Sequence, residues 1–258
     1  MSDSIQVKKS GNNAVLTLNN PPANTWTEQS LQLLQDVIHD LNNDKSNFSL
    51  VITGQGEKFF SAGADLKLFA GGEVGVASAM SRAFGAAFET LAAYEGVSIA
   101  AINGYAMGGG LECALACDLR IAEAQTVLAL PEAKVGLLPC GGGTQTLPWI
   151  VGESWAKRMI LCGEQVNSET ALRIGLVDEV TEKGQSLDKA VALAAQVANQ
   201  SPSSVSASKK LIMSARTQPM GHAWAGEREA FVALFETDDQ TEGVNAFLEK
   251  RKPQWKNQ

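Results

Sequence analysis

Two segments in the first hundred residues repeat apolar side chains at the spacing of a helix. In the first segment the apolar residues are Leu31, Leu34, Val37, Ile38 and Leu41. In the second they are Met80, Phe84, Phe88 and Leu91. Steps of three and four residues place each set on one helical face, so the pattern predicts two amphipathic helices. For the first helix we expect a capping box of Thr25 and Glu28 at its start, and an end at Asn42 and Asn43.

Short runs of β-branched and apolar residues predict strands between and after these helices. The predicted strands cover residues 5–9, 14–18, 48–53, 59–60, 98–102 and 176–180. A turn at Gly11, Asn12 and Asn13 joins the first two as a hairpin. The order strand, strand, helix occurs over residues 5–41 and again over 48–91. This recurrence favours a spiral of ββα units over a doubly wound sheet, in which single strands and helices alternate.

The stretch from Ile99 to Thr144 combines a strand-like run, a glycine turn and two acidic residues. Its turn consists of Gly108, Gly109 and Gly110, and glycine lets the backbone approach a ligand because no Cβ stands in the way. A helix that begins there presents free N–H groups, which favour negative charge. We therefore expect the turn to bind an oxyanion while Glu112 and Glu132 transfer protons.

The last third of the chain has a predominantly helical pattern. We predict a helix over 155–161, then a short helix that Asn167 or Ser168 caps and Gly175 ends. Three longer helices follow over 187–199, 205–215 and 223–236. Because no strand is predicted beyond residue 186, we divide the chain into an α/β core of residues 1–185 and a helical region of residues 186–258.

Composition narrows the class of protein. The 258 residues are 45% hydrophobic and 19% charged, which suits one large globular domain or a core with a smaller appended unit. The net charge of -7 argues against nucleic acid as a partner. We expect no membrane association, because no apolar run approaches the ~20 residues that span a bilayer. The N-terminus lacks a signal-peptide core and the four cysteines do not resemble a disulfide framework, so we expect a cytoplasmic protein.

Several kinds of chemistry are excluded by missing residues. The chain has only two histidines, His39 and His222, and neither lies among acids or cysteines, which excludes a Ser-His-Asp triad and a histidine-rich metal site. It also lacks the glycine motifs of nucleotide and dinucleotide sites. Carboxylates and backbone amides remain, and they suit proton transfer next to a carbonyl whose oxygen gains enolate charge. We expect neither a metal nor a separate cofactor.

Each candidate also has an ordinary structural interpretation. Glu112 could be a solvated residue favoured by the helix dipole, and Glu132 a simple loop acid. The three glycines could only permit close packing. Cys113 and Cys117 lie one helical turn apart, but without histidine partners they fit buried apolar positions better than a metal site. Asp65 and Lys67 could be plain surface charges.

Five segments together resemble the crotonase (enoyl-CoA hydratase/isomerase) superfamily. The central segments are NGYAMGGGLECALACDLRIA and ALPEAKVGLLPCGGGTQTL, the upstream loop is FFSAGADLKLF, and GLVDEV and FVALFETDDQTEGVNAFLEKRKPQWK follow. The resemblance covers nearly the whole chain in order. It implies an α/β crotonase-like ββα superhelix, with a C-terminal helical region that forms homotrimers or homohexamers.

The resemblance also implies a substrate and roles for individual residues. The substrate would be an acyl-CoA thioester, with coenzyme A as part of the substrate. The backbone amides of Ala64 and Gly109 would form the oxyanion hole, and Glu112 and Glu132 would hold the attacking water and transfer its proton. The coenzyme A site would include Ala62, Ala64, Asp65, Leu66, Lys67, Gly109, Phe247 and Lys250, with Lys250 reaching the site of a neighbouring subunit.

Both glutamates are present, which favours hydration of a trans-2-enoyl-CoA to a 3-hydroxyacyl-CoA. One alternative is an enoyl-CoA isomerase or other acyl-CoA lyase that uses Glu132 alone, and a second is a non-catalytic acyl-CoA-binding scaffold. One position departs from the family pattern: Cys140 stands where hydratases usually carry glycine, beside the catalytic water. The scaffold serves fatty acid, branched amino acid and aromatic breakdown, so the resemblance leaves the acyl group open.

Overall fold

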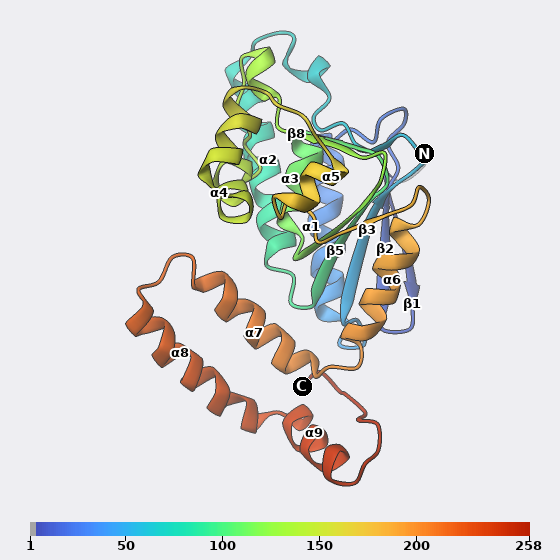
Figure 1. Ribbon diagram of the computed structural model, residues 1–258, viewed down its shortest axis with the longest axis vertical. Helices are drawn as coiled ribbons and strands as arrows, with labels where there is room; N and C mark the ends of the chain where they lie inside the picture. The colour runs from blue at the N-terminus through green and yellow to red at the C-terminus, as the bar shows by residue number, and fades with distance from the viewer. Residues whose placement is uncertain (1–3) are drawn as a thin grey trace.

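The computed structural model describes residues 4–258, and two sheets form the centre of the fold (Figure 1). In the large sheet, β1 pairs antiparallel with β2 and the other neighbours pair in parallel. Its strands, in spatial order, are β1 (Ile5–Ser10), β2 (Asn13–Leu18), β3 (Ser49–Gly54), β5 (Val97–Ile102), β7 (Leu119–Glu123) and β10 (Glu179–Thr181). The small sheet contains β4 (Phe59–Ser61), β6 (Tyr105–Met107), β8 (Val127–Ala129) and β9 (Val166–Asn167).

The predicted ββα spiral is confirmed by how the strands divide between the sheets. Each of the pairs β3–β4, β5–β6 and β7–β8 contributes its first strand to the large sheet and its second to the small sheet. A helix follows each pair, namely α2 (Val74–Ala92), α3 (Gly109–Ala116) and α4 (Gly143–Leu161). The chain thus turns three times through the same unit, and the turns that join the small sheet to the helices lie side by side.

Helices cover the large sheet on both faces. On one face Leu16, Leu50 and Ile52 pack in the main core with α1 (Glu28–Asn43) and α2. On the other face Val51 and Ile99 pack against small side chains of α6 (Ser186–Val197). Adjacent residues of β3 therefore point to opposite sides, which explains why this strand is apolar throughout.

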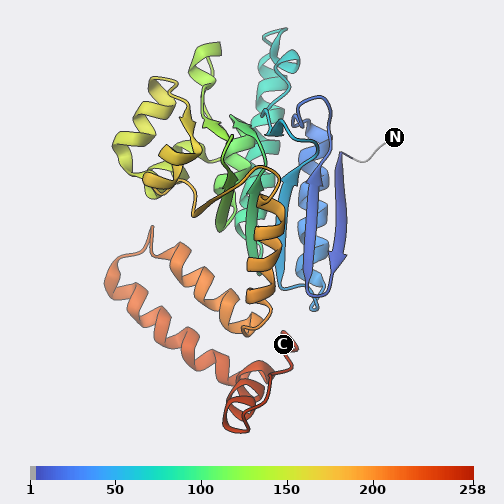
Figure 2. The same ribbon diagram turned by 45° about the vertical axis from the view of Figure 1, so that its right-hand side comes forward.

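The remaining helices form an arm that extends from the core (Figures 1 and 2). Its members are α7 (Pro202–Ser214), α8 (Met220–Ala233), the 3-10 turn η3 (Leu234–Glu236) and α9 (Asp238–Leu248). Lys209 ties α7 to the core, because its ammonium donates to the carbonyls of Tyr94 and Gly96 and lies 2.7 Å from the carboxylate of Asp118. The division at residue 186 stays a prediction, and α6, directly after it, packs on the large sheet.

Several expected element ends differ from the structure. The predicted capping box of Thr25 and Glu28 is wrong, since Thr27 caps α1 in exchange with Ser30. Trp26 is held in an extended bridge with Ala64, so the helix begins only after it. Asn167 is confirmed as the cap of α5 (Ser168–Arg173), with its side chain accepting from the Thr170 N–H. The strand predicted over residues 176–180 is found slightly later, as β10. Helix α4 begins twelve residues earlier than expected, and α9 was not predicted.

Candidate active site

A loop that follows β4 provides the first backbone donor of the site. The N–H of Ala62 donates to the carbonyl of Ala23 (2.9 Å), and the N–H of Trp26 donates to the carbonyl of Gly63 (2.8 Å). These bonds and the bridge between Trp26 and Ala64 hold the loop in an extended conformation. The N–H of Ala64 has no acceptor among residues 4–258. It is thus fixed in place and free to bind a ligand.

The glycine turn before α3 provides the second donor. Gly108 has φ 53, a left-handed conformation that glycine adopts without strain, and its N–H donates to the carbonyl of Ala129 (2.9 Å). The N–H of Gly109 lacks an acceptor within the described part of the chain. A Cβ on Gly63 would lie 3.0 Å from this nitrogen and 2.6 Å from the carbonyl oxygen of Met107. The loop and the turn are therefore in direct contact, and they bring the two free amides to the same place.

Glu112 lies in the first turn of α3 and is held by a second glycine segment. Its side chain is buried, with 3% of the residue exposed. One carboxylate oxygen, Oε1, accepts from the N–H groups of Gly141 and Gly143, both at 2.8 Å. Burial raises the pKa of Glu112, while these two N–H groups act in the opposite direction by stabilising the charged form. The second oxygen, Oε2, accepts no hydrogen bond from the described residues.

Glu132 begins the 3-10 turn η2 (Glu132–Val135) and faces the glycine turn from the other side. Its two carboxylate oxygens are buried and have no hydrogen-bond partner within residues 4–258. A Cβ on Gly108 would lie 3.0 Å from Oε1 of Glu132, so any larger residue there would crowd the carboxylate. Burial, and then the charge of Glu112, raise the pKa of Glu132 to about 7. This carboxyl group therefore exchanges protons near neutral pH.

These elements enclose a cavity of about 580 Å³. Its walls include most of the residues predicted for the site, namely Ala62, Ala64, Leu66, Gly109, Glu112 and Glu132. Cys140 also lines it, and burial with the charges of Glu112 and Glu132 raises the pKa of this thiol to about 11. The thiol is therefore protonated at neutral pH. Within residues 4–258 no group of three acidic, histidine or cysteine side chains is arranged to hold a metal ion.

Four of the predicted coenzyme A residues lie outside this cavity. Asp65 caps its own turn by accepting from the N–H of Lys67 (3.1 Å), and neither residue lines the cavity. Phe247 lies near the end of α9 and Lys250 just after it, on the arm (Figure 1), and neither residue lines the cavity of the same chain. Their contact with coenzyme A stays a prediction, which for Lys250 involves a neighbouring subunit.

Sequence reasoning missed the residues that hold Glu112 and part of the cavity wall. The second glycine cluster was evident, but its role in donating to Glu112 was not, because the donors are 29 and 31 residues away in sequence. Phe84 was assigned only to a helix core, yet its ring also lines the cavity. The signal that could have indicated this contact is the glycine run itself, Gly141 to Gly143, which follows Glu132 and the β7–β8 pair.

Comparison with known proteins gives one consistent family. The profile described as enoyl-CoA hydratase/isomerase matches residues 8–258. A probable enoyl-CoA hydratase of Bacillus subtilis is 38% identical, with 95% of both chains covered. A short-chain-enoyl-CoA hydratase of Clostridium acetobutylicum is 36% identical, covering 97% of this chain and 96% of its own.

Solved structures agree with the fold. The structure of Pseudomonas aeruginosa DspI has a TM-score of 0.96 and 59% identity, covering 98% of this chain and 97% of that one. An enoyl-CoA hydratase of Bacillus anthracis has a TM-score of 0.94 and 33% identity, covering 99% and 100%. At these identities the likeness extends to the sequence as well as to the fold.

Proposed function

Because the chain belongs to the enoyl-CoA hydratase/isomerase family, we propose that it adds water to a trans-2-enoyl-CoA and releases a 3-hydroxyacyl-CoA. The observation that carries this proposal is the pairing of Glu112 and Glu132 across one cavity with two free backbone amides. An isomerase needs one carboxyl group to move a proton between two carbons. Hydration can make use of two, because one accepts the proton of water while the other protonates the neighbouring carbon.

The backbone amides of Ala64 and Gly109 would receive the thioester oxygen. Water addition to C3 pushes electrons onto this oxygen, and two fixed N–H donors stabilise the charge as it develops. The loop bonds to Ala23 and Trp26 keep the Ala64 donor in position before the substrate arrives. Little reorganisation is then required during the reaction, and the removal of one such donor typically lowers the rate about 10²–10³-fold.

The roles proposed for the two glutamates follow from their different surroundings. Glu112 is oriented by the N–H groups of Gly141 and Gly143, which stabilise its ionised form, so it would orient water and accept its proton. Glu132 has a pKa of about 7 and no competing hydrogen bond, so it would donate a proton to C2. The oxygen of water bonds to C3, C2 receives the proton of Glu132, and proton transfer from Glu112 to Glu132 restores the pair.

The test follows the loss of the conjugated enoyl thioester of crotonyl-CoA and identifies the product. We expect a 3-hydroxyacyl-CoA, and we expect Glu112→Gln to lower its formation about 10²–10⁴-fold. A 3-enoyl-CoA in deuterated water provides the contrast with an isomerase. If double-bond migration dominates and persists in Glu112→Gln, the protein is an isomerase that uses Glu132. Binding of enoyl-CoA without turnover would indicate an acyl-CoA-binding scaffold.

We also propose that the helical arm mediates self-association into a trimer or a pair of trimers. Large apolar side chains of α8 and η3 are exposed in the single chain, including Trp224 (58%), Phe231 (63%) and Phe235 (58%). Such a surface is typical of an interface between subunits. The mass in solution tests this directly, and Phe231→Asp is expected to reduce it. A monomeric protein with full activity would contradict both the assembly and the contribution of Lys250 from a neighbour.

A further inference from the structure

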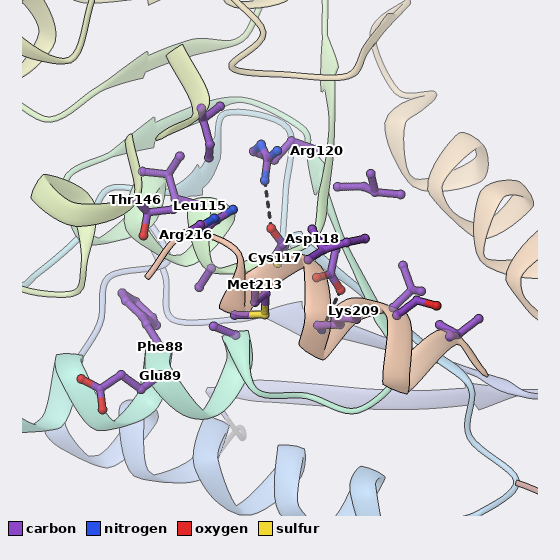
Figure 3. A pocket seen from close by; sticks show the side chains of 18 of the residues that line it. Phe88, Glu89, Leu115, Cys117, Asp118, Arg120, Thr146, Lys209, Met213 and Arg216 are labelled. Carbon is purple, nitrogen blue, oxygen red and sulfur yellow. Dashed lines mark hydrogen bonds and ion pairs between the residues drawn. The ribbon is translucent and has the colours of Figure 1, made fainter. Parts of the chain in front are cut away.

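A second cavity lies on the far side of Glu112, between the core and the arm (Figure 3). Its volume is about 890 Å³, larger than the catalytic cavity. Phe88 of α2, Leu115 of α3 and Met213 of α7 face this space. A volume of this size is within the range of cavities that bind small ligands.

The two cavities are separated by a wall only one side chain thick. Glu112 lines both of them. Phe84 lines the catalytic cavity and Phe88, one helical turn later, lines the second, with their ring centroids 5.6 Å apart. Adjacent residues of one loop divide in the same way, since Cys140 faces the first cavity and Gly141 the second. The second cavity thus lies directly beside the place where the reaction would occur, with Glu112 in the wall between them.

Helix α3 begins at the catalytic cavity and ends at the second cavity. Gly109, at the start of the helix, carries the amide that would bind the thioester, whereas Leu115 and Ala116, at its end, line only the second cavity. At 1.5 Å per residue, Gly109 and Ala116 are about 10 Å apart along the helix axis. A crotonyl chain has three carbon–carbon bonds of about 1.5 Å and reaches less than half of this distance.

The walls of the second cavity suit a hydrocarbon chain. Phe88, Leu115 and Met213 are joined by Val205 and Ile212 of α7. Three cations line the wall. Arg216 is exposed just beyond the end of α7, and the other two have partners in the protein. Lys209 pairs with Asp118 at 2.7 Å. Arg120 donates to the carbonyls of Leu176 (2.8 Å) and Cys117 (2.9 Å). An apolar chain can therefore enter without removing the partners of these two charges.

We infer that the acyl chain of the substrate passes Glu112, runs along α3 and occupies the second cavity, so that the protein selects medium-chain enoyl thioesters over crotonyl-CoA. The identity of the thioester head rests on the proposed function. The chain length rests on the shared wall and on the apolar lining. A chain of about eight to twelve carbons spans the length of α3, given bonds of about 1.5 Å and a rise of 1.5 Å per residue.

Kinetics on a series of trans-2-enoyl-CoA esters tests this inference with the intact protein. Each methylene that becomes buried is worth up to about 0.8 kcal/mol, or about fourfold in kcat/KM. The four methylenes that distinguish octenoyl from crotonyl therefore give a preference of up to roughly 250-fold. A profile that is flat or falls from crotonyl to octenoyl would overturn the inference.

A variant that fills the second cavity makes the test specific. Ser208 lies on α7, is exposed and lines this cavity but not the catalytic one. We expect Ser208→Trp to lower the ratio of kcat/KM for octenoyl-CoA over crotonyl-CoA at least about tenfold, through loss of methylene burial. The control is Lys210→Trp, on the same helix but outside both cavities, which should leave the ratio unchanged. Equal effects of Ser208→Trp on both esters would contradict the inference.

Binding of saturated esters separates this inference from the proposed reaction. Butyryl-CoA and octanoyl-CoA have no double bond to hydrate, so calorimetry measures their affinity independently of turnover. Tighter binding of octanoyl-CoA, lost in Ser208→Trp, supports the second cavity even if no enoyl ester is hydrated. Hydration of crotonyl-CoA together with equal affinity for both saturated esters would refute the inference and leave the proposed function intact.

Discussion

Replacement of Glu132 by glutamine should make the protein less active and, above neutral pH, more stable. Both carboxylate oxygens of Glu132 are buried without a partner in the described part of the chain, and its pKa is raised from 4.5 to about 7. Glutamine has nearly the same shape but never carries the charge. The substitution therefore removes the proposed proton donor and, at the same time, the cost of holding a carboxylate in this place.

The sign and size of the stability change follow from linkage between folding and protonation. Below pH 4.5 Glu132 is protonated in both the folded and unfolded chain, so wild type and Glu132→Gln should be similarly stable. As pH rises from 4.5 to about 7, only the unfolded chain ionises fully, and wild type loses stability relative to the variant. The shift corresponds to about 3 kcal/mol at most, which we reduce to about 1–2 kcal/mol because the residue is only half-buried beside an open cavity.

Thermal unfolding at a fixed protein concentration from pH 5 to pH 9 measures this difference. One to two kcal/mol corresponds to about 2–8 °C in Tm for a chain of this size, with Glu132→Gln more stable above pH 7. Hydration should fall about 10²–10⁴-fold in the same variant. Glu182→Gln removes an exposed acid outside the arm and serves as the control, with no change expected in either quantity. Equal Tm values at every pH, or wild-type hydration by Glu132→Gln, would refute the reasoning.

Three further substitutions test the glycine segment that holds Glu112, the cysteine at position 140 where the family usually has glycine, and the attachment of the arm to the core. A Cβ at Gly141 would lie 2.5 Å from the ring of Phe88 and 3.1 Å from Oε2 of Glu112. Gly141→Ala should therefore lower the free energy of unfolding in denaturant by about 1–3 kcal/mol, and it should also lower kcat. Retention of both values would show that the loop shifts freely. Cys140→Gly removes a protonated thiol from beside both glutamates and should raise kcat for crotonyl-CoA several-fold, whereas an unchanged or lower kcat would show that the thiol does not hinder water. Lys209→Met leaves Asp118 and two carbonyls without their shared donor. We expect the free energy of unfolding to fall by about 1–3 kcal/mol, measured by calorimetry. An unchanged Tm would contradict the role of Lys209 in holding α7.

The fold could be predicted where local pattern and burial agree. The apolar face of α1 repeats at helical spacing and packs in the core, and the strands β3 and β5 are apolar because both of their faces are covered. The predicted start of α1 failed because a long-range contact overrides the local signal. Trp26 pairs with Ala64, 38 residues later, and this bridge keeps the segment extended past Thr25.

The site could be predicted only in part from the sequence, for a related reason. The glycine turn and both glutamates carry local signals and a family resemblance, and the structure brings them to one cavity. What holds them is not local. The N–H groups that orient Glu112 come from another turn of the spiral, and α9 was missed because its sequence, DDQTEGVNAFL, has few apolar positions to mark a buried face.

The arrangement along α3 separates chemistry from substrate length. Its first residue, Gly109, carries the amide proposed to bind the thioester, Glu112 follows one turn later in the wall of both cavities, and Leu115 and Ala116 end the helix in the second cavity. A side chain at the end of the helix can therefore change the space for the acyl chain while the bonds that hold Glu112 remain in place. The catalytic end is far less tolerant, because a Cβ at Gly109 would lie 2.7 Å from the ring of Phe84 and one at Gly110 would lie 2.2 Å from the carbonyl oxygen of Ser61. Variation in chain-length preference is thus expected to arise at the C-terminal end of α3 and on α7, with the glycine turn unchanged.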